Sequence, residues 1–414
     1  MNMPLQREGA AARMRFVVEL ARRLHQYGAA APRLESAIDS VSARLGLHCD
    51  SLSTPTALIL SFSAGAHAED DLSEHTQVIR LSPGDVNLRR MCEVDEIADR
   101  VIAGTLDIEE GSRLLRAIHR RRNTRNRVYT AGSYGIAAAA VAAILHAVWA
   151  DVAVAGVIGI LIGAIALASE GRPRLAASFE AISALLATLF ATAAGVWLVP
   201  LNVKTVVLAA LIVLLPGLSL TTAVRELSTQ HLASGVARLA GAMMSLLKLA
   251  FGTLAATEIC KALHWVPLAV AASKVPGWAE WAALGFGCLS FAVLFQSARR
   301  DYPLVMASAA LGYIVAYYGS SAFTPDFGVF LAGLTIGAAS NLYARAARRP
   351  GALVREPGII LLVPGSVGFR TLSLMFERDV YLGLDVGFTL VAILVALVAG
   401  LLFGDLLVTP RRSL

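Results

Sequence analysis

The distribution of apolar and polar positions divides the chain into two parts. Residues 1 to about 128 mix charged and apolar side chains as a soluble domain does, and from Val128 long apolar stretches follow one another. A helix that crosses a bilayer needs about 20 mostly apolar residues. The pattern predicts about ten such spans, at 129–148, 151–169, 179–200, 203–224, 236–258, 280–298, 302–320, 326–345, 357–376 and 383–408.

The first part predicts an α+β domain over residues 1–128. Apolar residues recur at helical spacing through 16–24 and again through 38–45. The stretches 48–63 and 75–82 are rich in apolar and β-branched residues and predict strands, with the polar segment 64–74 as a hairpin loop. Two more helices close the domain, and acidic residues at the start of the last one favour its N-terminus.

Composition and charge agree with a multi-span membrane protein. Hydrophobic residues make up 56% of the chain and charged residues only 16%, which is rare for a soluble chain of this length. If the N-terminal domain is cytoplasmic, about 12 Lys and Arg residues fall in cytoplasmic loops and tails and about 4 outside, as the positive-inside rule requires. The sequence therefore predicts an inner-membrane protein with both termini in the cytoplasm. The start of the chain predicts no cleaved signal peptide, and the net charge of +6 follows from the loops and does not indicate nucleic-acid binding.

The sequence gives little support for a metal site, a cofactor site or a catalytic site. The four cysteines are scattered without CxxC spacing, which predicts reduced structural thiols and no metal site. Within the soluble part, metal ligands and nucleophiles lack any HExxH, GxSxG, Walker A or GxGxxG context. We expect no cofactor and no enzymatic activity. The residues weighed for these roles are His67, Asp70, Asp71 and His75 as ligands and Ser53 and Thr54 as nucleophiles.

The membrane part repeats itself. The fourth span of each half carries a Pro-Gly pair, Pro216–Gly217 and Pro364–Gly365, and the fifth carries Phe-Gly, Phe251–Gly252 and Phe403–Gly404. Five is an odd number, so the second half must lie upside down relative to the first. The sequence therefore predicts two inverted five-span repeats, over residues 129–258 and 259–414.

Paired interrupted helices in corresponding positions indicate a transporter's binding site. A break frees carbonyl groups and exposes the N-terminus of a half-helix, which suits an anionic group. Kinks that serve only packing are the alternative, because Pro and Gly are common in membrane helices. The predicted pocket lies between spans four and nine near the midplane. Its expected residues are Pro216, Gly217, Ser219, Thr221, Thr222, Pro364, Gly365, Ser366 and Arg370.

Ionisable residues inside spans are functional candidates, because charge within the bilayer is costly. Asp405 follows Phe403–Gly404, whereas the corresponding residue of the first half, Thr253, is neutral. We therefore expect Asp405 to exchange a coupling proton, with Lys248 and Glu258 as further candidates. The alternative is that these residues lie at the membrane interface and have no role in coupling.

Several segments resemble the threonine/serine exporter family over most of the chain. The most specific are "LLPGLSLTTAVREL" (Leu214 to Leu227), "SGVARLAGAM" (Ser234 to Met243) and "EPGIILLVPGSVGFR" (Glu356 to Arg370). The resemblance implies a cytoplasmic domain followed by about ten spans. It also implies proton-linked export of threonine and serine across a lipid bilayer. Related two-part proteins imply an alternative, dicarboxylate export, in which Arg370 and Lys248 would pair the second carboxylate. A membrane-anchored hydrolase is a third possibility, and assembly as a homo-oligomer stays open.

Overall fold

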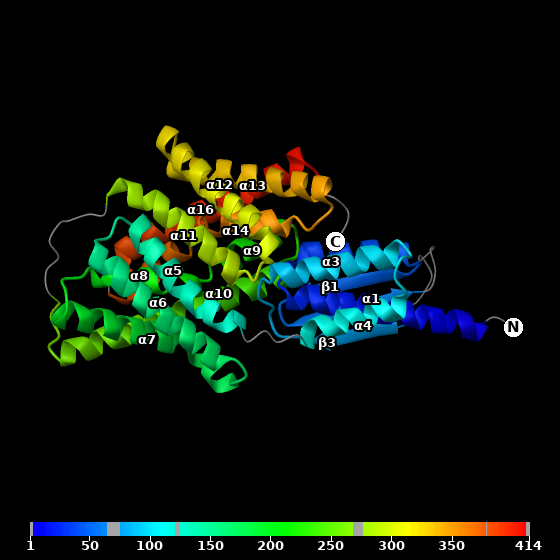
Figure 1. Ribbon diagram of the computed structural model, residues 1–414, viewed down its shortest axis with the longest axis horizontal. Coiled ribbons are helices and arrows are strands. Elements are labelled where there is room, and N and C mark those ends of the chain that lie inside the picture. Colours follow the sequence, from blue (N-terminus) through cyan, green and yellow to red (C-terminus); the bar gives the residue numbers. More distant parts are fainter. Residues whose placement is uncertain (1–2, 64–74, 121–124, 268–275, 378, 411–414) are drawn as a thin grey trace.

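The computed structural model describes residues 3–63, 75–120, 125–267, 276–377 and 379–410. The N-terminal part forms a separate mixed domain at one end of the molecule, and the remaining helices form a bundle beside it (Figure 1). The segment 64–74, predicted as a hairpin loop, lies outside the described residues.

The N-terminal domain is α+β, as the sequence predicts. Its order is α1 (Met3–Gln26), α2 (Ala31–Arg44), β1 (His48–Thr54), β2 (Ala57–Ser63), β3 (His75–Arg80), α3 (Leu88–Ile102) and α4 (Ile108–Arg120). The strands form one antiparallel sheet in the order β1-β2-β3. The stretch 48–63 gives two strands because a tight turn at Pro55 and Thr56 divides it, and the Ala57 N–H donates to Thr54 Oγ1 there at 3.1 Å. The predicted helical faces are buried, with Phe16, Leu20 and Ile38 fully inside the core.

The remaining described elements are helices. They are α5 (Arg125–Ile144), α6 (Trp149–Ser169), α7 (Pro173–Trp197), α8 (Val203–Ala210), η1 (Ile212–Leu214), α9 (Gly217–Ser228), α10 (Leu232–Ala262), α11 (Gly277–Leu294), η2 (Arg299–Asp301), α12 (Tyr302–Ala322), α13 (Pro325–Ala347), α14 (Ala352–Ile360), α15 (Gly365–Phe376) and α16 (Val380–Leu407).

Every predicted span has a helical counterpart, and most of these helices are apolar enough to cross a membrane. Among the described residues, eight stretches meet this criterion of length and composition, one of them being α14 and α15 taken together, and the bent pair α8 and α9 makes a ninth. Helix α5 does not meet it, because Arg127, Tyr129 and Ser133 make its first half more polar. The chain is therefore a multi-span helical membrane protein, and the tenth span stays a prediction for α5.

Glycines let several of these helices approach closely, among them those of the runs 156–163 and 333–337. A Cβ at Gly159 would lie 2.7 Å from the Tyr134 carbonyl oxygen, and one at Gly333 would lie 2.7 Å from the Leu397 carbonyl oxygen. The glycines of the two Phe-Gly pairs do the same. A Cβ at Gly404 would lie 2.6 Å from the Leu334 carbonyl oxygen of α13, and Gly252 packs equally closely on Ala181 of α7. Such close contacts between small residues are typical of helices that pack in a membrane.

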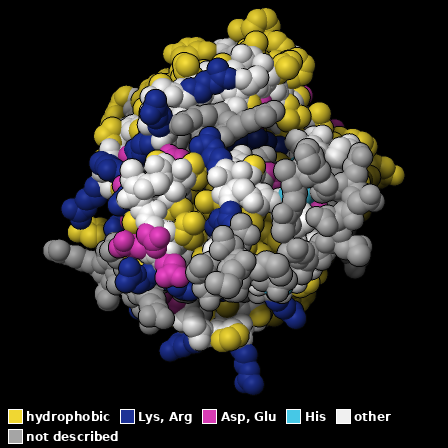
Figure 2. Space-filling model, turned by 90° about the vertical axis from the view of Figure 1, so that its right-hand side faces the viewer, with side chains coloured by type: hydrophobic (Ala, Val, Ile, Leu, Met, Phe, Trp, Pro, Cys, Tyr) yellow, Lys and Arg dark blue, Asp and Glu magenta, His cyan; other side chains and the backbone are white. Residues whose placement is uncertain are grey.

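The outer surfaces of the two parts differ. Large apolar side chains are exposed along the membrane helices, among them Val157, Phe388 and Leu406, far beyond what a soluble protein exposes. The end view onto the N-terminal domain instead shows charged side chains spread across the face (Figure 2).

The two parts are joined by backbone and side-chain contacts. The Leu88 N–H donates to the carbonyl of Phe295, just after α11, at 3.0 Å, and Asn87 donates to Gln296 at 2.7 Å. We call the side of the helical bundle that meets the N-terminal domain the near side, and the opposite side the far side. Helix α11 therefore runs from the far side to the near side.

Candidate functional site

The two predicted helix breaks are present at the Pro-Gly pairs. Helix α8 gives way to a short 3-10 turn, and α9 begins at Gly217 with a bend of 49° between the two parts. In the same way α14 ends at Ile360 and α15 begins at Gly365. Both prolines occupy the position just before the new helix, with φ near −80° and ψ near 40° (Pro216 −79°, 42°; Pro364 −84°, 39°). Proline is favourable at the start of a helix and not within one, so the sequence places each restart.

The two breaks lie against each other. A Cβ on Gly217 would lie 2.8 Å from a methyl carbon of Val363 and 3.2 Å from the backbone nitrogen of Gly365. A Cβ on Gly365 would lie 3.0 Å from Cβ of Leu215 and 3.1 Å from the backbone nitrogen of Gly217. The contacts are reciprocal, and only glycine fits without displacing its neighbours at both positions. Residues about 150 apart in the sequence thus form one junction in the middle of the bundle.

The two half-helices that start at this junction run in opposite directions. Helix α9 ends on the near side, where its Glu226 contacts Ala31 of the N-terminal domain. Helix α15 ends on the far side, where Glu377 pairs with Lys204 at the start of α8 at 2.8 Å. Their N-termini therefore meet head to head. Among the described residues, five backbone N–H groups in these first turns have no hydrogen-bond partner, namely those of Leu218, Ser219, Gly365, Ser366 and Val367. Such groups and the helix dipoles favour a negative charge at this place.

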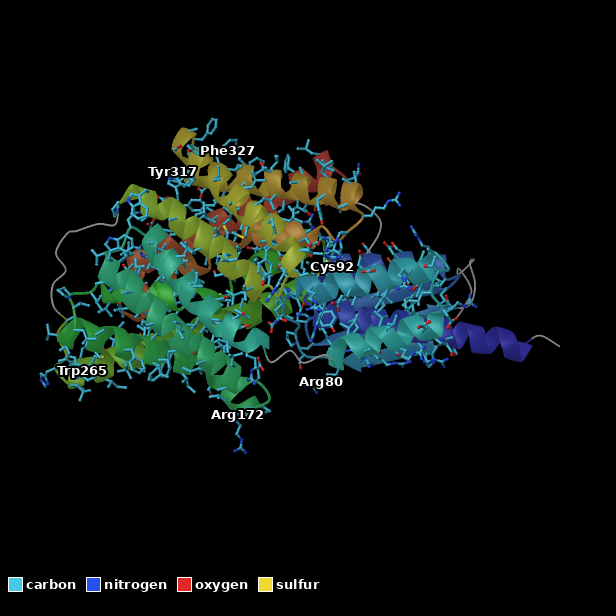
Figure 3. The ribbon with its side chains drawn as sticks, in the orientation of Figure 1. Arg80, Cys92, Arg172, Trp265, Tyr317 and Phe327 are labelled. Atoms are coloured by element: carbon cyan, nitrogen blue, oxygen red, sulfur yellow. The ribbon has the colours of Figure 1, made fainter. Side chains whose placement is uncertain are left out.

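A cavity of about 550 Å³ adjoins the second break. Its volume lies within the range of small-molecule pockets. Hydroxyl groups and apolar side chains line it, and none of its described lining residues carries a charge. Tyr317 lies toward the far side, away from Cys92 of the N-terminal domain (Figure 3). The lining residues that bear on chemistry are Tyr313, Tyr317, Ser320, Ser321, Pro364 and Ser366.

The predicted pocket residues are only partly brought together. Pro364 and Ser366 line the cavity, and Gly217 and Gly365 form the junction beside it. Ser219, Thr221 and Thr222 continue along α9 and are not among the lining residues; Thr221 is buried and its hydroxyl has no partner among the described residues. The side chain of Arg370 is exposed and lines neither cavity described here.

Asp405 lies on the near side in a cluster of partly buried polar side chains. Its carboxylate accepts hydrogen bonds from Arg225 at 3.0 Å, from Arg355 at 2.6 Å and from the Asn341 amide at 2.7 Å. A second cavity, of about 510 Å³, opens between this cluster and α2, and Arg33 of the N-terminal domain also lines it. Burial lowers the pKa of Arg33, and Asp95 opposes that shift. Asp405 is therefore part of an ionic contact between spans, far from the hydroxyl-lined cavity.

The other two predicted coupling residues have local partners. Lys248 donates to the Ala177 carbonyl at 3.0 Å and lies 3.6 Å from the carboxylate of Glu180 on α7. Glu258 is exposed and pairs with Lys261, one turn later on the same helix, at 2.7 Å. Neither residue lines a described cavity.

Sequence reasoning did not consider several carboxylates of the helical bundle, among them Glu180, Glu226 and Glu280. Glu180 and Glu280 stand at the start of predicted spans three and six, and Glu226 stands inside a motif noted for other reasons. Glu280 is nearly buried and binds Tyr313, which lines the hydroxyl-lined cavity. Glu226 is fully buried and binds Arg238 through two bonds of 3.0 Å. The sequence signal that could have identified them is a carboxylate at the edge of an apolar run.

Contacts from the N-terminal domain converge on Glu226 and its neighbours. The Ala31 N–H at the start of α2 donates to Glu226 at 3.1 Å, and Glu35 of the same helix lies 3.2 Å from His231. Burial raises the pKa of Glu35, while the Ser53 N–H and His231 act against that shift. The domain is thus held on the segment that follows the first break.

The candidate chemistry of the N-terminal domain finds no arrangement to support it. The Ser53 N–H donates to Glu35, and the Thr54 hydroxyl closes the turn to β2. His67, Asp70 and Asp71 lie outside the described residues, and His75 contacts Gln77 on β3. Over the part of the chain that the structure describes, no three His, Cys, Asp or Glu side chains are grouped as a metal site. The four cysteines are buried and free.

Comparison with known proteins assigns the family. A model of a threonine/serine exporter matches residues 15–260, and a second, described as Threonine/Serine exporter, ThrE, matches residues 281–407. The chain belongs to the threonine/serine exporter family. The resemblance found in the sequence is thereby confirmed, and the two matches together cover the N-terminal domain and both halves of the helical bundle.

Curated relatives of this family member are larger proteins from yeasts. Pheromone-regulated membrane protein 10 of Zygosaccharomyces rouxii is 24% identical over 366 residues, which cover 87% of this chain and 37% of the relative. The protein of the same name from Eremothecium gossypii is 23% identical, covering 87% and 49%. An uncharacterised protein of Schizosaccharomyces pombe is 24% identical, covering 96% and 51%. The chain thus spans about half or less of the length of these relatives. No solved structure matches.

Proposed function

We propose that this chain is a secondary exporter of small hydroxy amino acids, threonine and serine, driven by the proton gradient. The observation that carries the proposal is the cavity at the second break, lined by hydroxyl groups and the start of α15 and by no described charged residue. The free N–H groups at the helix starts suit the carboxylate of an amino acid. Serine and tyrosine hydroxyls suit its side-chain hydroxyl.

The same observation favours amino acids over dicarboxylates. A dicarboxylate needs a second cationic partner, and neither Arg370 nor Lys248 lines the cavity. Burying an unpaired carboxylate there would cost several kcal/mol. The hydrolase alternative has no nucleophile arrangement among the described residues to favour it.

The proposal includes the arrangement in the membrane. Ten spans, with α5 as the tenth, form two inverted repeats related through the junction of Gly217 and Gly365. The opposite directions of α9 and α15 and their reciprocal contacts support this relation. The near side then faces the cytoplasm, as do both termini, in an inner membrane. The hydroxyl-lined cavity opens toward the outside. Coupling through Asp405, Lys248 or Glu258 stays a prediction.

Transport by the purified full chain in proteoliposomes tests the function. Vesicles are loaded with labelled threonine, serine or succinate, and an inward proton gradient is imposed across the membrane. We expect the gradient to accelerate loss of threonine and serine and a protonophore to abolish that acceleration, with succinate unaffected. Loss of succinate without loss of threonine or serine would show that the dicarboxylate alternative is correct.

A further inference from the structure

Glu280 is a membrane carboxylate without a described lysine or arginine partner. It stands in the first turn of α11, on the far side, and is only 7% exposed. The Tyr313 hydroxyl of α12 donates to Glu280 Oε1 at 2.7 Å, and the His146 Nε2 lies 3.3 Å from Glu280 Oε2. Lys274, which precedes α11, falls outside the described residues.

Tyr313 connects this carboxylate to the proposed substrate site, because the same side chain lines the cavity beside Pro364 and Ser366. A phenol has one hydrogen to donate and lone pairs to accept with, whereas an ionised carboxylate only accepts. While Glu280 is ionised, Tyr313 must give its hydrogen to Glu280. Its oxygen is then free to accept a hydrogen bond from a ligand in the cavity. A primary ammonium group only donates, so it matches this oxygen.

Protonation of Glu280 reverses the direction of this hydrogen bond. The carboxylic acid can donate to the Tyr313 oxygen, and the phenol hydrogen can then turn toward the cavity. A donor facing the cavity repels an ammonium group and no longer accepts from it. A proton on Glu280 therefore disfavours an ammonium group in the cavity, which is the relation that exchange of an entering proton for a leaving amino acid requires.

We propose that Tyr313, oriented by Glu280, binds the ammonium group of the substrate, and that Glu280 takes up the proton that displaces it. This inference rests on the proposed function, and it identifies the substrate class as amino acids with a free ammonium group. Dicarboxylates lack that group and gain nothing from this pair.

The remaining titratable groups around Glu280 fit this role. His146 follows α5, and its side chain is 54% exposed, which gives protons a route from water on the far side. Tyr317 on α12 stacks with Tyr313 at 6.1 Å between ring centroids. Helix α14 also contacts α11, but its charged residues Arg355 and Glu356 stand near its start, on the near side.

Asp405 is a poorer acceptor of the proton for a structural reason. Protonating it would leave Arg225 and Arg355 without the carboxylate that both bind, and an unpaired buried cation is costly. Protonating Glu280 removes no described lysine or arginine pair. The two residues can be compared directly, since Asp405→Asn and Glu280→Gln each remove one carboxylate.

The test measures the affinity for threonine of the purified full chain between pH 8 and pH 5, without a gradient. In wild type, one competing proton weakens binding by about tenfold per pH unit at the acid end. In Glu280→Gln this pH dependence should vanish and gradient-driven export should be lost, while exchange persists. Tyr313→Phe should weaken threonine binding by about tenfold or more. It should leave binding of 3-hydroxybutyrate, which has no ammonium group, unchanged.

A second measurement needs no variant. In weakly buffered detergent solution, threonine should release protons from the wild-type protein and 3-hydroxybutyrate should not. Asp326→Asn serves as the control, since this exposed carboxylate also stands in the first turn of a span on the far side, and it should behave as wild type. Wild-type pH dependence in Glu280→Gln, or equal proton release with both ligands, would overturn the inference. Wild-type protein that moves neither threonine nor serine would instead refute the proposed function.

Discussion

Glu226 offers a quantitative test of how the N-terminal domain is held on the helical bundle. Its side chain is fully buried and accepts four hydrogen bonds, from the Ala31 N–H at 3.1 Å, the Ser234 hydroxyl at 2.9 Å and two Arg238 nitrogens at 3.0 Å each. Each carboxylate oxygen accepts two of the four bonds. In Glu226→Gln the amide NH₂ must replace one oxygen, so it faces two donors whichever way it turns.

The expected cost follows from these contacts. Breaking a buried ion pair by removing one partner costs about 3–5 kcal/mol, since the other charge stays behind. Arg238 keeps 22% of its side chain exposed, so water relieves part of its charge and the lower end, about 3 kcal/mol, applies. A local opening that becomes easier by about 3 kcal/mol is populated roughly a hundredfold more often.

Amide hydrogen exchange followed by mass spectrometry measures how often this local opening occurs. Amide protons at the start of α2 and in the segment 226–240 should exchange roughly a hundredfold faster in Glu226→Gln. The matched control is Glu377→Gln, which breaks an exposed pair with Lys204 and should cost at most about 1 kcal/mol. Unchanged exchange at α2 in Glu226→Gln would refute the reasoning, because it would mean that Glu226 does not hold the domain.

Three further predictions follow from other sites. Replacing both residues of 216–217 or of 364–365 by alanine should restore a continuous helix and place a Cβ within about 3 Å of the opposite break. Transport in proteoliposomes should therefore fall steeply. Wild-type transport by both variants would show that the breaks are kinks that serve only packing. Asp405→Asn distinguishes the two candidates for the coupling proton: if Glu280 takes up the proton, Asp405→Asn should keep gradient-driven accumulation, whereas loss of accumulation with exchange retained would assign the coupling role to Asp405, as the sequence predicts. Burial lowers the pKa of His25, with the Thr54 carbonyl opposing, so the stability from the neutral ring is present above about pH 6.5 and lost as pH falls. Calorimetry should show this loss in wild type and a flatter profile in His25→Gln.

The local pattern was enough to predict the helices and their interruptions. Runs of apolar residues set the spans, and the Pro-Gly pairs at 216–217 and 364–365 mark where helices restart. A Pro-Gly pair does not always do so, because Pro357–Gly358 lies inside α14. The Phe-Gly pairs were noted only as a repeated feature, and the structure adds that both of their glycines are places where helices approach closely. For α5 the pattern was weaker, because arginine and tyrosine occupy its first half.

The pairing of distant side chains was beyond local reasoning. Asp405 looked isolated in the sequence, yet its partners come from α9, α13 and α14, and no periodicity within α16 reveals them. Glu280 was overlooked because a carboxylate at a span boundary is expected to be solvated. Only the position of Tyr313, one helix later, shows that it is enclosed.

The two breaks share the same proline conformation and are unequal in charge, and this has a mechanical consequence. Helix α9 leaves the junction toward the near side and carries Arg225 and Glu226, which bind Asp405 and the N-terminal domain. Helix α15 leaves toward the far side, where Arg370 binds no described residue and Glu377 only an exposed lysine. Three of the four bonds of Glu226 come from Ser234 and Arg238 of α10, and one comes from Ala31 of the N-terminal domain. A movement of α9 that keeps all four must therefore take both α10 and the N-terminal domain with it. The contact that such a movement would break is the one between Arg225 and Asp405 of α16.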